Sequence, residues 1–220
     1  MLKAVIFDLD GVLVNSEPIY DQHRIGYSKK RFNVEIDREF MTKVRGLSSK
    51  SFWEILFREF NITHSIEEVI NHSRADYFEF LKNHPDLKPI DGVVKLINEL
   101  RKSGVKLAVA SSASLRRINF ILELFGIKDK FQAIAHSDNV KLGKPHPDIY
   151  LKAAELLGVD PKDCISIEDA KSGVKSAKAA GMKVVGFKES SHNTQDLSEA
   201  DLIIKNFSGL NLERLKNLAL

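Results

Sequence analysis

The second half of the chain alternates apolar segments of strand length with segments whose apolar residues recur at helical spacing. The strand-like segments are Val105–Ala110, Phe131–Ala135, Cys164–Ile167, Val184–Phe187 and Leu202–Ile204. Helical spacing is found over residues 115–125, 147–157, 174–180 and 210–218, and the first three of these segments stop at glycines, which commonly follow a helix C-terminus. This order of elements predicts a parallel sheet with right-handed crossovers.

The N-terminal segment Ala4–Phe7 belongs with this sheet, because its apolar residues suit a central strand that is covered on both faces. Residues 17–86 differ: they contain several helical stretches and no convincing strand. That segment also holds the only tryptophan and most of the phenylalanines and tyrosines, with Phe52, Trp53, Leu56, Phe57 and Phe60 along one helix face. It is predicted to form a small helical domain with its own core, inserted into an α/β domain made of residues 1–16 and 87–220.

Composition excludes several classes of partner. The 220 residues include 33 Lys+Arg and 30 Asp+Glu, a net charge of +3, and no basic block is longer than Lys29–Arg31, so no nucleic acid partner is expected. A single cysteine, Cys164, excludes an intrachain disulfide and a cysteine zinc site. The apolar run Ala4–Phe7 is too short for a signal peptide, and no run approaches the roughly 20 residues of a membrane helix. We therefore expect a cytoplasmic monomer or weak homo-oligomer with no membrane partner.

Two acids, Asp8 and Asp10, follow directly after the first strand. Residues two apart in an extended chain share a face, so both carboxylates can point into the crevice where parallel sheets bind ligands. Two close carboxylates favour a bound cation or a shared proton, and one can be a nucleophile while the other acts as acid and base. An Asp-Gly turn is the structural alternative.

Two further signals are typical of phosphate binding. Ser111 and Ser112 lie just past the strand at Val105–Ala110, where a hydroxyl and free backbone N–H groups at a helix start bind phosphate. The structural alternative is plain N-capping, which Ser112 or Ser114 would serve equally. Lys144 lies in a loop that two prolines stiffen, and a lysine held near carboxylates suits a phosphate, although a surface lysine in a turn has the same sequence signature.

A second pair of acids, Glu168 and Asp169, ends the strand at Cys164–Ile167. These carboxylates could meet Asp8 and Asp10 across the switch point, where the strand order of the sheet reverses, and complete a cation site made of oxygen ligands. Magnesium suits such a site, because it takes few protein carboxylates and keeps waters and phosphate oxygens. The structural alternative is the preference of helix N-termini for acidic residues.

Together these motifs resemble the haloacid dehalogenase superfamily. Its four motifs match Asp8-Leu9-Asp10-Gly11-Val12, Ser111, Lys144-Pro145 and Glu168-Asp169 over essentially the whole chain. The resemblance is to the first subclass, which carries a helical cap and includes sugar-phosphate phosphatases and β-phosphoglucomutase. It implies an α/β fold with a Rossmann-like parallel-sheet core and a small inserted all-helical cap domain.

The resemblance also implies residue roles. Asp8 would attack phosphorus to form an aspartyl-phosphate, and Asp10 would protonate the leaving oxygen and then activate water. The residues implied to bind the phosphoryl group are Ser111, Ser112 and Lys144. The groups implied to bind Mg²⁺ are Asp8, the backbone carbonyl of Asp10, Asp169, and Glu168 either directly or through water.

The function so implied is a magnesium-dependent phosphatase acting on a small phosphorylated metabolite, a sugar or polyol phosphate. A β-phosphoglucomutase-type mutase is the alternative; such relatives are expected to carry histidine near Tyr20 and arginine near Ser49, and here only Arg45 and Lys50 are nearby. A phospho-accepting signalling domain fits less well, because it needs neither the second acid nor the helical insertion. Dehalogenase and phosphonatase relatives lack an acid at the position of Asp10.

Overall fold

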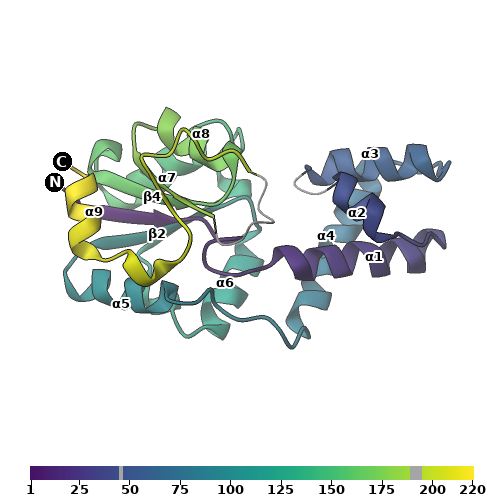
Figure 1. Ribbon diagram of the computed structural model, residues 1–220, viewed down its shortest axis with the longest axis horizontal. Helices are drawn as coiled ribbons and strands as arrows, with labels where there is room; N and C mark the ends of the chain where they lie inside the picture. Colours follow the sequence, from purple (N-terminus) through teal and green to yellow (C-terminus); the bar gives the residue numbers. More distant parts are fainter. Residues whose placement is uncertain (45–46, 189–194) are drawn as a thin grey trace. The chain divides into compact units, whose positions relative to one another are not determined.

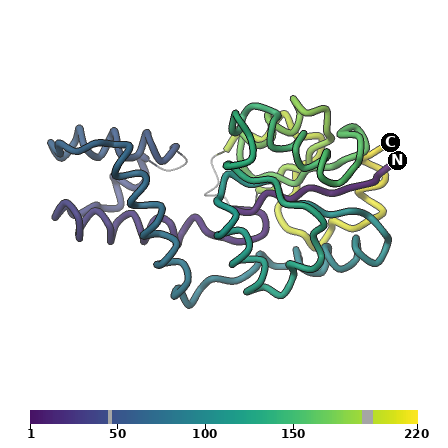
Figure 2. Tube along the Cα trace, turned by 180° about the vertical axis from the view of Figure 1, so that it is seen from behind, coloured from purple at the N-terminus to yellow at the C-terminus, as the bar shows by residue number. Residues whose placement is uncertain are grey.

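The computed structural model describes residues 1–44, 47–188 and 195–220, and it divides the chain into two compact units. The core unit consists of Met1–Asn15 and Lys88–Leu220, and the helical unit is Ser16–Leu87. Figure 2 follows the chain out of the core unit after the first strand and back into it. Among the described residues no helix combines the length and the apolarity that crossing a membrane requires.

The core unit is built on one sheet of six parallel strands in the order β3-β2-β1-β4-β5-β6. The strands are β1 (Ala4–Phe7), β2 (Lys106–Ser111), β3 (Ala133–His136), β4 (Cys164–Glu168), β5 (Lys183–Phe187) and β6 (Leu202–Ile204). The predicted α/β class with a Rossmann-like parallel sheet is confirmed. The chain adds strands outward from β1 to β3 and then returns to place β4 on the other side of β1. The strand order therefore reverses beside β1, and open α/β sheets bind ligands at this topological switch point.

Helices cover both faces of this sheet. They are α5 (Val93–Lys102), α6 (Leu115–Leu124), α7 (Asp148–Leu157), α8 (Lys171–Ala179) and α9 (Leu212–Leu218). Figure 1 shows α7 and α8 on one face and α5 and α9 on the other. All four residues of β1 are fully buried, which is why this strand is uniformly apolar. Helix α5 was not predicted, and β3 begins two residues later than predicted because Phe131 closes a short 3-10 turn.

Strand register brings the ends of three strands together. Phe7, the last residue of β1, pairs with Val109 of β2 and with Ile167 of β4. The residues that follow these three are Asp8, Ala110 and Glu168. The backbone N–H of Asp8 donates to the carbonyl of Ile167 at 3.0 Å, which extends the pairing to the first acid.

The described residues of the helical unit form four α-helices. They are α1 (Glu17–Phe32), α2 (Arg38–Val44), α3 (Ser49–Glu59) and α4 (Ile66–Lys82). Its core centres on Phe52, Trp53 and Leu56, which are fully buried against Tyr27 and other apolar residues. Phe60, predicted on the same face, is 37 % exposed because it follows the last turn of α3.

The two chain crossings between the units are joined on the core side. Val14 and Pro89 form an isolated antiparallel bridge. The N–H of Ile90 donates to the carbonyl of Leu13 at 3.1 Å. The outgoing and returning segments are therefore hydrogen-bonded to each other.

Candidate active site

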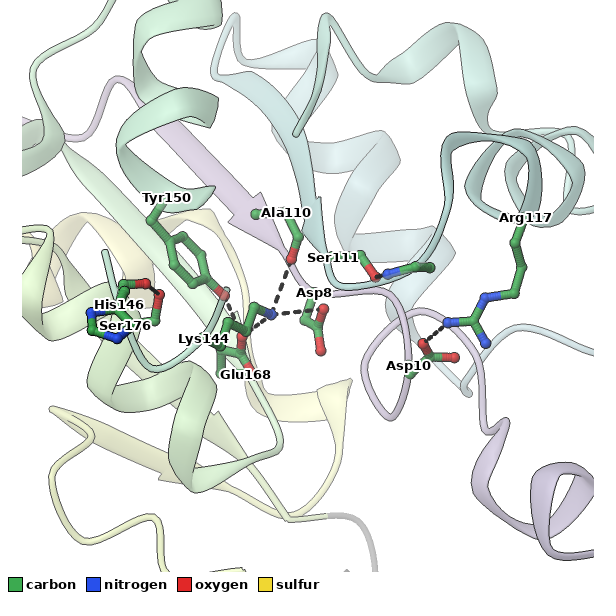
Figure 3. Close-up of polar contacts among 11 residues, drawn as sticks. Asp8, Asp10, Ala110, Ser111, Arg117, Lys144, His146, Tyr150, Glu168 and Ser176 are labelled. Carbon is green, nitrogen blue, oxygen red and sulfur yellow. Dashed lines mark hydrogen bonds and ion pairs between the residues drawn. The ribbon is translucent and has the colours of Figure 1, made fainter. Parts of the chain in front are cut away.

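Lys144 lies at the centre of the site and makes three contacts through its ammonium group. Its Nζ is 2.9 Å from Oδ1 of Asp8 and 2.5 Å from Oε1 of Glu168. It also donates to the carbonyl of Ala110 at 3.1 Å (Figure 3). The three donors of an ammonium group match these three acceptors, one from each of the central strands' ends. Lys144 is thus a buried cation that joins β1, β2 and β4.

Glu168 is fully buried at the end of β4. Besides Lys144, the hydroxyl of Tyr150 on α7 donates to the same Oε1 oxygen. The other oxygen, Oε2, is enclosed and has no hydrogen-bond partner among the described residues. A buried carboxylate oxygen without a donor is costly, so this atom is available to a ligand.

Three carboxylates form a group of the kind that binds metals. One oxygen each from Asp8, Glu168 and Asp169 lies within 4.8 Å of the others. Asp169 reaches this position because the loop after β1 has glycine at position 11: a Cβ on Gly11 would lie 2.0 Å from Oδ2 of Asp169, and its φ of +75° also favours glycine. The backbone of this loop is therefore in close contact with the carboxylate.

Burial and the closeness of the three carboxylates shift the pKa values of the site residues. Burial raises the pKa of Asp8 to about 7; Lys144 acts against this effect and Glu168 adds to it. Burial also raises the pKa of Asp169 well above its usual range, and the charges of Asp8 and Glu168 contribute. Burial opposes the charge on Lys144, but Asp8 and Glu168 outweigh it and raise its pKa. Lys144 is thus paired with Asp8 and Glu168, and its charge also acts on Asp169. A divalent cation would relieve the repulsion among the three acids.

Gly173 provides space for the carboxylate of Glu168. A Cβ on Gly173 would lie 2.0 Å from Cδ of Glu168 and 2.1 Å from each of its oxygens. We expect Gly173→Ala to lower the free energy of unfolding by about 1–3 kcal/mol, because the held carboxylate or α8 must move. The measurement is urea denaturation.

Gly26 in α1 is the matched control, because a Cβ there meets nothing within 4 Å. Gly26→Ala should raise stability by up to about 1 kcal/mol through helix propensity. If Gly173→Ala were as stabilising as Gly26→Ala, the steric role of Gly173 would be wrong.

The two predicted serines lie beside this group at the end of β2. Ser111 is buried, and its Oγ accepts a hydrogen bond from the N–H of Ala113 at 3.1 Å. Ser112 is exposed in the bend that follows. The N-cap of α6 is Ser114, whose Oγ accepts from the N–H of Arg117. Capping by Ser114 leaves both serines outside the helix: Ser111 is the last residue of β2, and Ser112 lies in the loop between β2 and α6.

Asp10 is placed differently from the expectation for an extended chain. Its carboxylate is ion-paired with Arg117 of α6 and is not one of the three clustered carboxylates (Figure 3). The reason is local, because the chain turns after Asp8: the N–H groups of Leu13 and Val14 both donate to the carbonyl of Leu9. The rule that residues two apart share a face holds only within a strand.

Sequence reasoning missed two residues of this neighbourhood, Tyr150 and Arg117. Tyr150 is fully buried in the core between α7 and the sheet, and its pKa is raised by burial and by Glu168. Its sequence signal is that of an apolar helix face, and nothing local points to an acid 18 residues away. Arg117 likewise carries no local signal for Asp10.

Comparison with known proteins identifies the family of the chain. The family model described as haloacid dehalogenase-like hydrolase matches residues 5–187. The chain therefore belongs to the haloacid dehalogenase-like hydrolase family, and it is an enzyme of that family.

Individual relatives include both phosphatases and mutases. The chain is 33% identical to β-phosphoglucomutase of Bacillus subtilis, over 97% of this chain and 94% of that protein. It is 32% identical to a phosphorylated carbohydrates phosphatase of Thermotoga maritima, over 92% of this chain and 93% of that protein. The crystal structure of β-phosphoglucomutase from Clostridium difficile has a TM-score of 0.79 at 27% identity and covers 100% of this chain and 97% of its own. Each is a protein that this chain is similar to.

Proposed function

We propose that the protein is a magnesium-dependent phosphatase that hydrolyses a sugar or polyol phosphate through an aspartyl-phosphate on Asp8. The observation that carries the proposal is Lys144, buried and 2.9 Å from Asp8, among three carboxylates at the switch point of the sheet. This arrangement combines a nucleophile, a phosphate-binding cation and metal ligands. The names of relatives, such as the Thermotoga maritima phosphatase, support the same substrate class.

In the proposed mechanism Asp8 supplies a carboxylate oxygen to phosphorus, and the bond to the substrate's leaving oxygen breaks. Asp10 donates a proton to that oxygen and then removes one from the water that hydrolyses the aspartyl-phosphate. Lys144, with Ser111 and Ser112, neutralises and orients the phosphoryl oxygens, because phosphoryl transfer depends mainly on positioning and charge. The Asp10 carboxylate is paired with Arg117 through Oδ2, and its side chain is partly exposed.

The carboxylate oxygens of the site suit magnesium as ligands. Asp8, Glu168 and Asp169 provide hard oxygen ligands, and the enclosed Oε2 of Glu168 has no other partner among the described residues. Magnesium usually takes one or two carboxylates together with waters and substrate phosphate, so three carboxylate groups suffice. When bound, the ion would neutralise charge that develops on the phosphoryl group.

We expect activity to require magnesium and calcium to inhibit it. Calcium takes more ligands in looser geometry, which disturbs the in-line alignment of Asp8 with phosphorus. The measurement is phosphate release from a panel of sugar, polyol and nucleotide phosphates, with magnesium, with calcium and with excess chelator. Full activity in chelator would contradict the metal assignment, and preference for nucleotides would contradict the substrate class.

The helical unit would serve as the cap of the family's first subclass, which supports a role in substrate choice. The single buried cysteine is in keeping with the reducing cytoplasm. The partner would be a small phosphorylated metabolite, bound by a monomer or weak homo-oligomer.

A mutase is the second candidate, favoured by the similarity to β-phosphoglucomutase of Bacillus subtilis. Returning the phosphoryl group to a sugar requires further groups at positions where this chain carries Tyr20 and Ser49. In the structure these two side chains bond to each other, with 3.2 Å between the hydroxyl of Tyr20 and Oγ of Ser49. Lys50 is exposed, and Arg45 lies outside the described residues. Attack of water on the aspartyl-phosphate needs only Asp10 as base. We therefore prefer the phosphatase to the mutase as the proposed function.

Phosphorus NMR of β-glucose 1-phosphate, with a trace of the bisphosphate, distinguishes the two. We expect inorganic phosphate to accumulate in proportion to the hexose or polyol phosphate consumed across the panel. Conversion of β-glucose 1-phosphate to glucose 6-phosphate without free phosphate would establish the mutase instead.

A further inference from the structure

Tyr150 contacts the carboxylate cluster through Glu168, and the proposed mechanism gives it no task. Its ring is fully buried in the apolar core between α7 and the sheet. Its hydroxyl donates to Oε1 of Glu168, as does Lys144, whose Nζ also lies 5.3 Å from the centre of the Tyr150 ring (Figure 3). The hydroxyl of Tyr150 therefore contacts a candidate metal ligand directly, and it can influence how that ligand is oriented.

The two donors on Oε1 differ in how well they can orient a carboxylate. The ammonium group of Lys144 ends a flexible chain, is not directional, and is shared with Asp8 and the carbonyl of Ala110. The terminal torsion of a glutamate is broad, so Lys144 alone leaves the carboxylate of Glu168 free to turn. Tyr150 donates from a rigid ring packed on all sides, and therefore fixes the direction from which Oε1 is held.

We infer that Tyr150 is a positioning residue for the metal site: by holding Oε1 it keeps Oε2 of Glu168 available as the metal-facing oxygen. Oε2 is enclosed and has no partner among the described residues, as this role requires. Gly173 limits the carboxylate on the helix side, where a Cβ would lie 2.1 Å from Oε2. The inference rests on the proposed magnesium site and assigns to Tyr150 a share of its affinity.

The test is Tyr150→Phe, which removes one oxygen and leaves the buried ring in place. Isothermal titration calorimetry of the full chain with magnesium chloride should give a dissociation constant about tenfold to a hundredfold higher than for the unchanged protein, the range found when partners of metal ligands are removed. Tyr27→Phe is the matched control, because Tyr27 is also buried and its hydroxyl is 2.9 Å from Nδ1 of His72 in the helical unit. Its magnesium affinity should be unchanged.

Melting of each protein with and without magnesium provides a second measurement that tolerates a less stable variant. The rise in melting temperature caused by magnesium should be smaller for Tyr150→Phe than for Tyr27→Phe. Equal magnesium affinity and equal stabilisation in the two variants would overturn the role of Tyr150 while leaving the metal site in place. If the unchanged protein bound no magnesium, that result would contradict the proposed magnesium site itself, and with it the role of Tyr150.

Discussion

Asp8→Asn is expected to bring phosphate release down to background while the protein remains folded. An amide keeps the shape of the side chain but cannot attack phosphorus, and loss of a nucleophile costs about 10⁴-fold or more. The melting temperature should stay level or rise, because a neutral group replaces one of three crowded buried carboxylates. The measurements are phosphate release in the presence of magnesium and thermal melting.

Asp138→Asn is a suitable control for this change, since the Asp138 side chain is 69% exposed on the same unit. It should keep full activity. Appreciable turnover by Asp8→Asn would remove Asp8 from the nucleophile role, and loss of structure would leave the variant unable to support it; a folded and inactive variant is the predicted result.

Lys144→Met is expected to reduce both activity and stability. Phosphate release should fall by about 10²-fold or more, because the cation nearest Asp8 is lost. At neutral pH the free energy of unfolding should fall by roughly 3–5 kcal/mol, the usual effect of removing one partner of a buried ion pair. Lys43→Met, which breaks an exposed pair with Glu59, should cost at most about 1 kcal/mol.

The stability deficit of Lys144→Met should depend on pH. Lys144 lowers the pKa of Asp8, so its removal raises that pKa further above the ordinary value of 3.8. A carboxyl whose pKa is higher in the folded than in the unfolded protein makes stability fall as pH rises between the two values. The deficit should therefore be small in acid and grow toward neutral pH. Urea denaturation across this range is the measurement, and a deficit that does not vary with pH would contradict the assignment.

The acids and the lysine of the site could be predicted because each lies near the carboxyl end of a strand. In a parallel sheet these ends lie on one edge, so local sequence signals at Asp8 and Glu168 translate directly into proximity. The positions of the strands were themselves readable from short β-branched and apolar runs. Helix α5 has the helical apolar spacing of Val93, Leu96, Ile97 and Leu100, but Gly92 at its N-cap carries no side-chain capping signal.

The contacts of Tyr150 and Arg117 could not be predicted, because they depend on how helices pack on the sheet. A tyrosine on an apolar helix face has the same sequence pattern whether its hydroxyl reaches water, a carbonyl or Glu168. The contact of Asp10 is a further case. Its spacing from Asp8 was read as that of a strand, whereas the chain turns at Gly11 and the Asp10 carboxylate is ion-paired with Arg117.

The bridge between Val14 and Pro89 bears on how an insertion of this size is accommodated. Since the two ends of the helical unit meet as neighbouring hydrogen-bonded segments, the core unit closes the same short gap whatever lies between them. The entropy of closing a loop grows only slowly with its length, so exchanging the helical unit for a longer or shorter one changes the cost of folding the core very little. Such a junction lets the inserted unit vary while the carboxylates at the strand ends of the core unit keep their places.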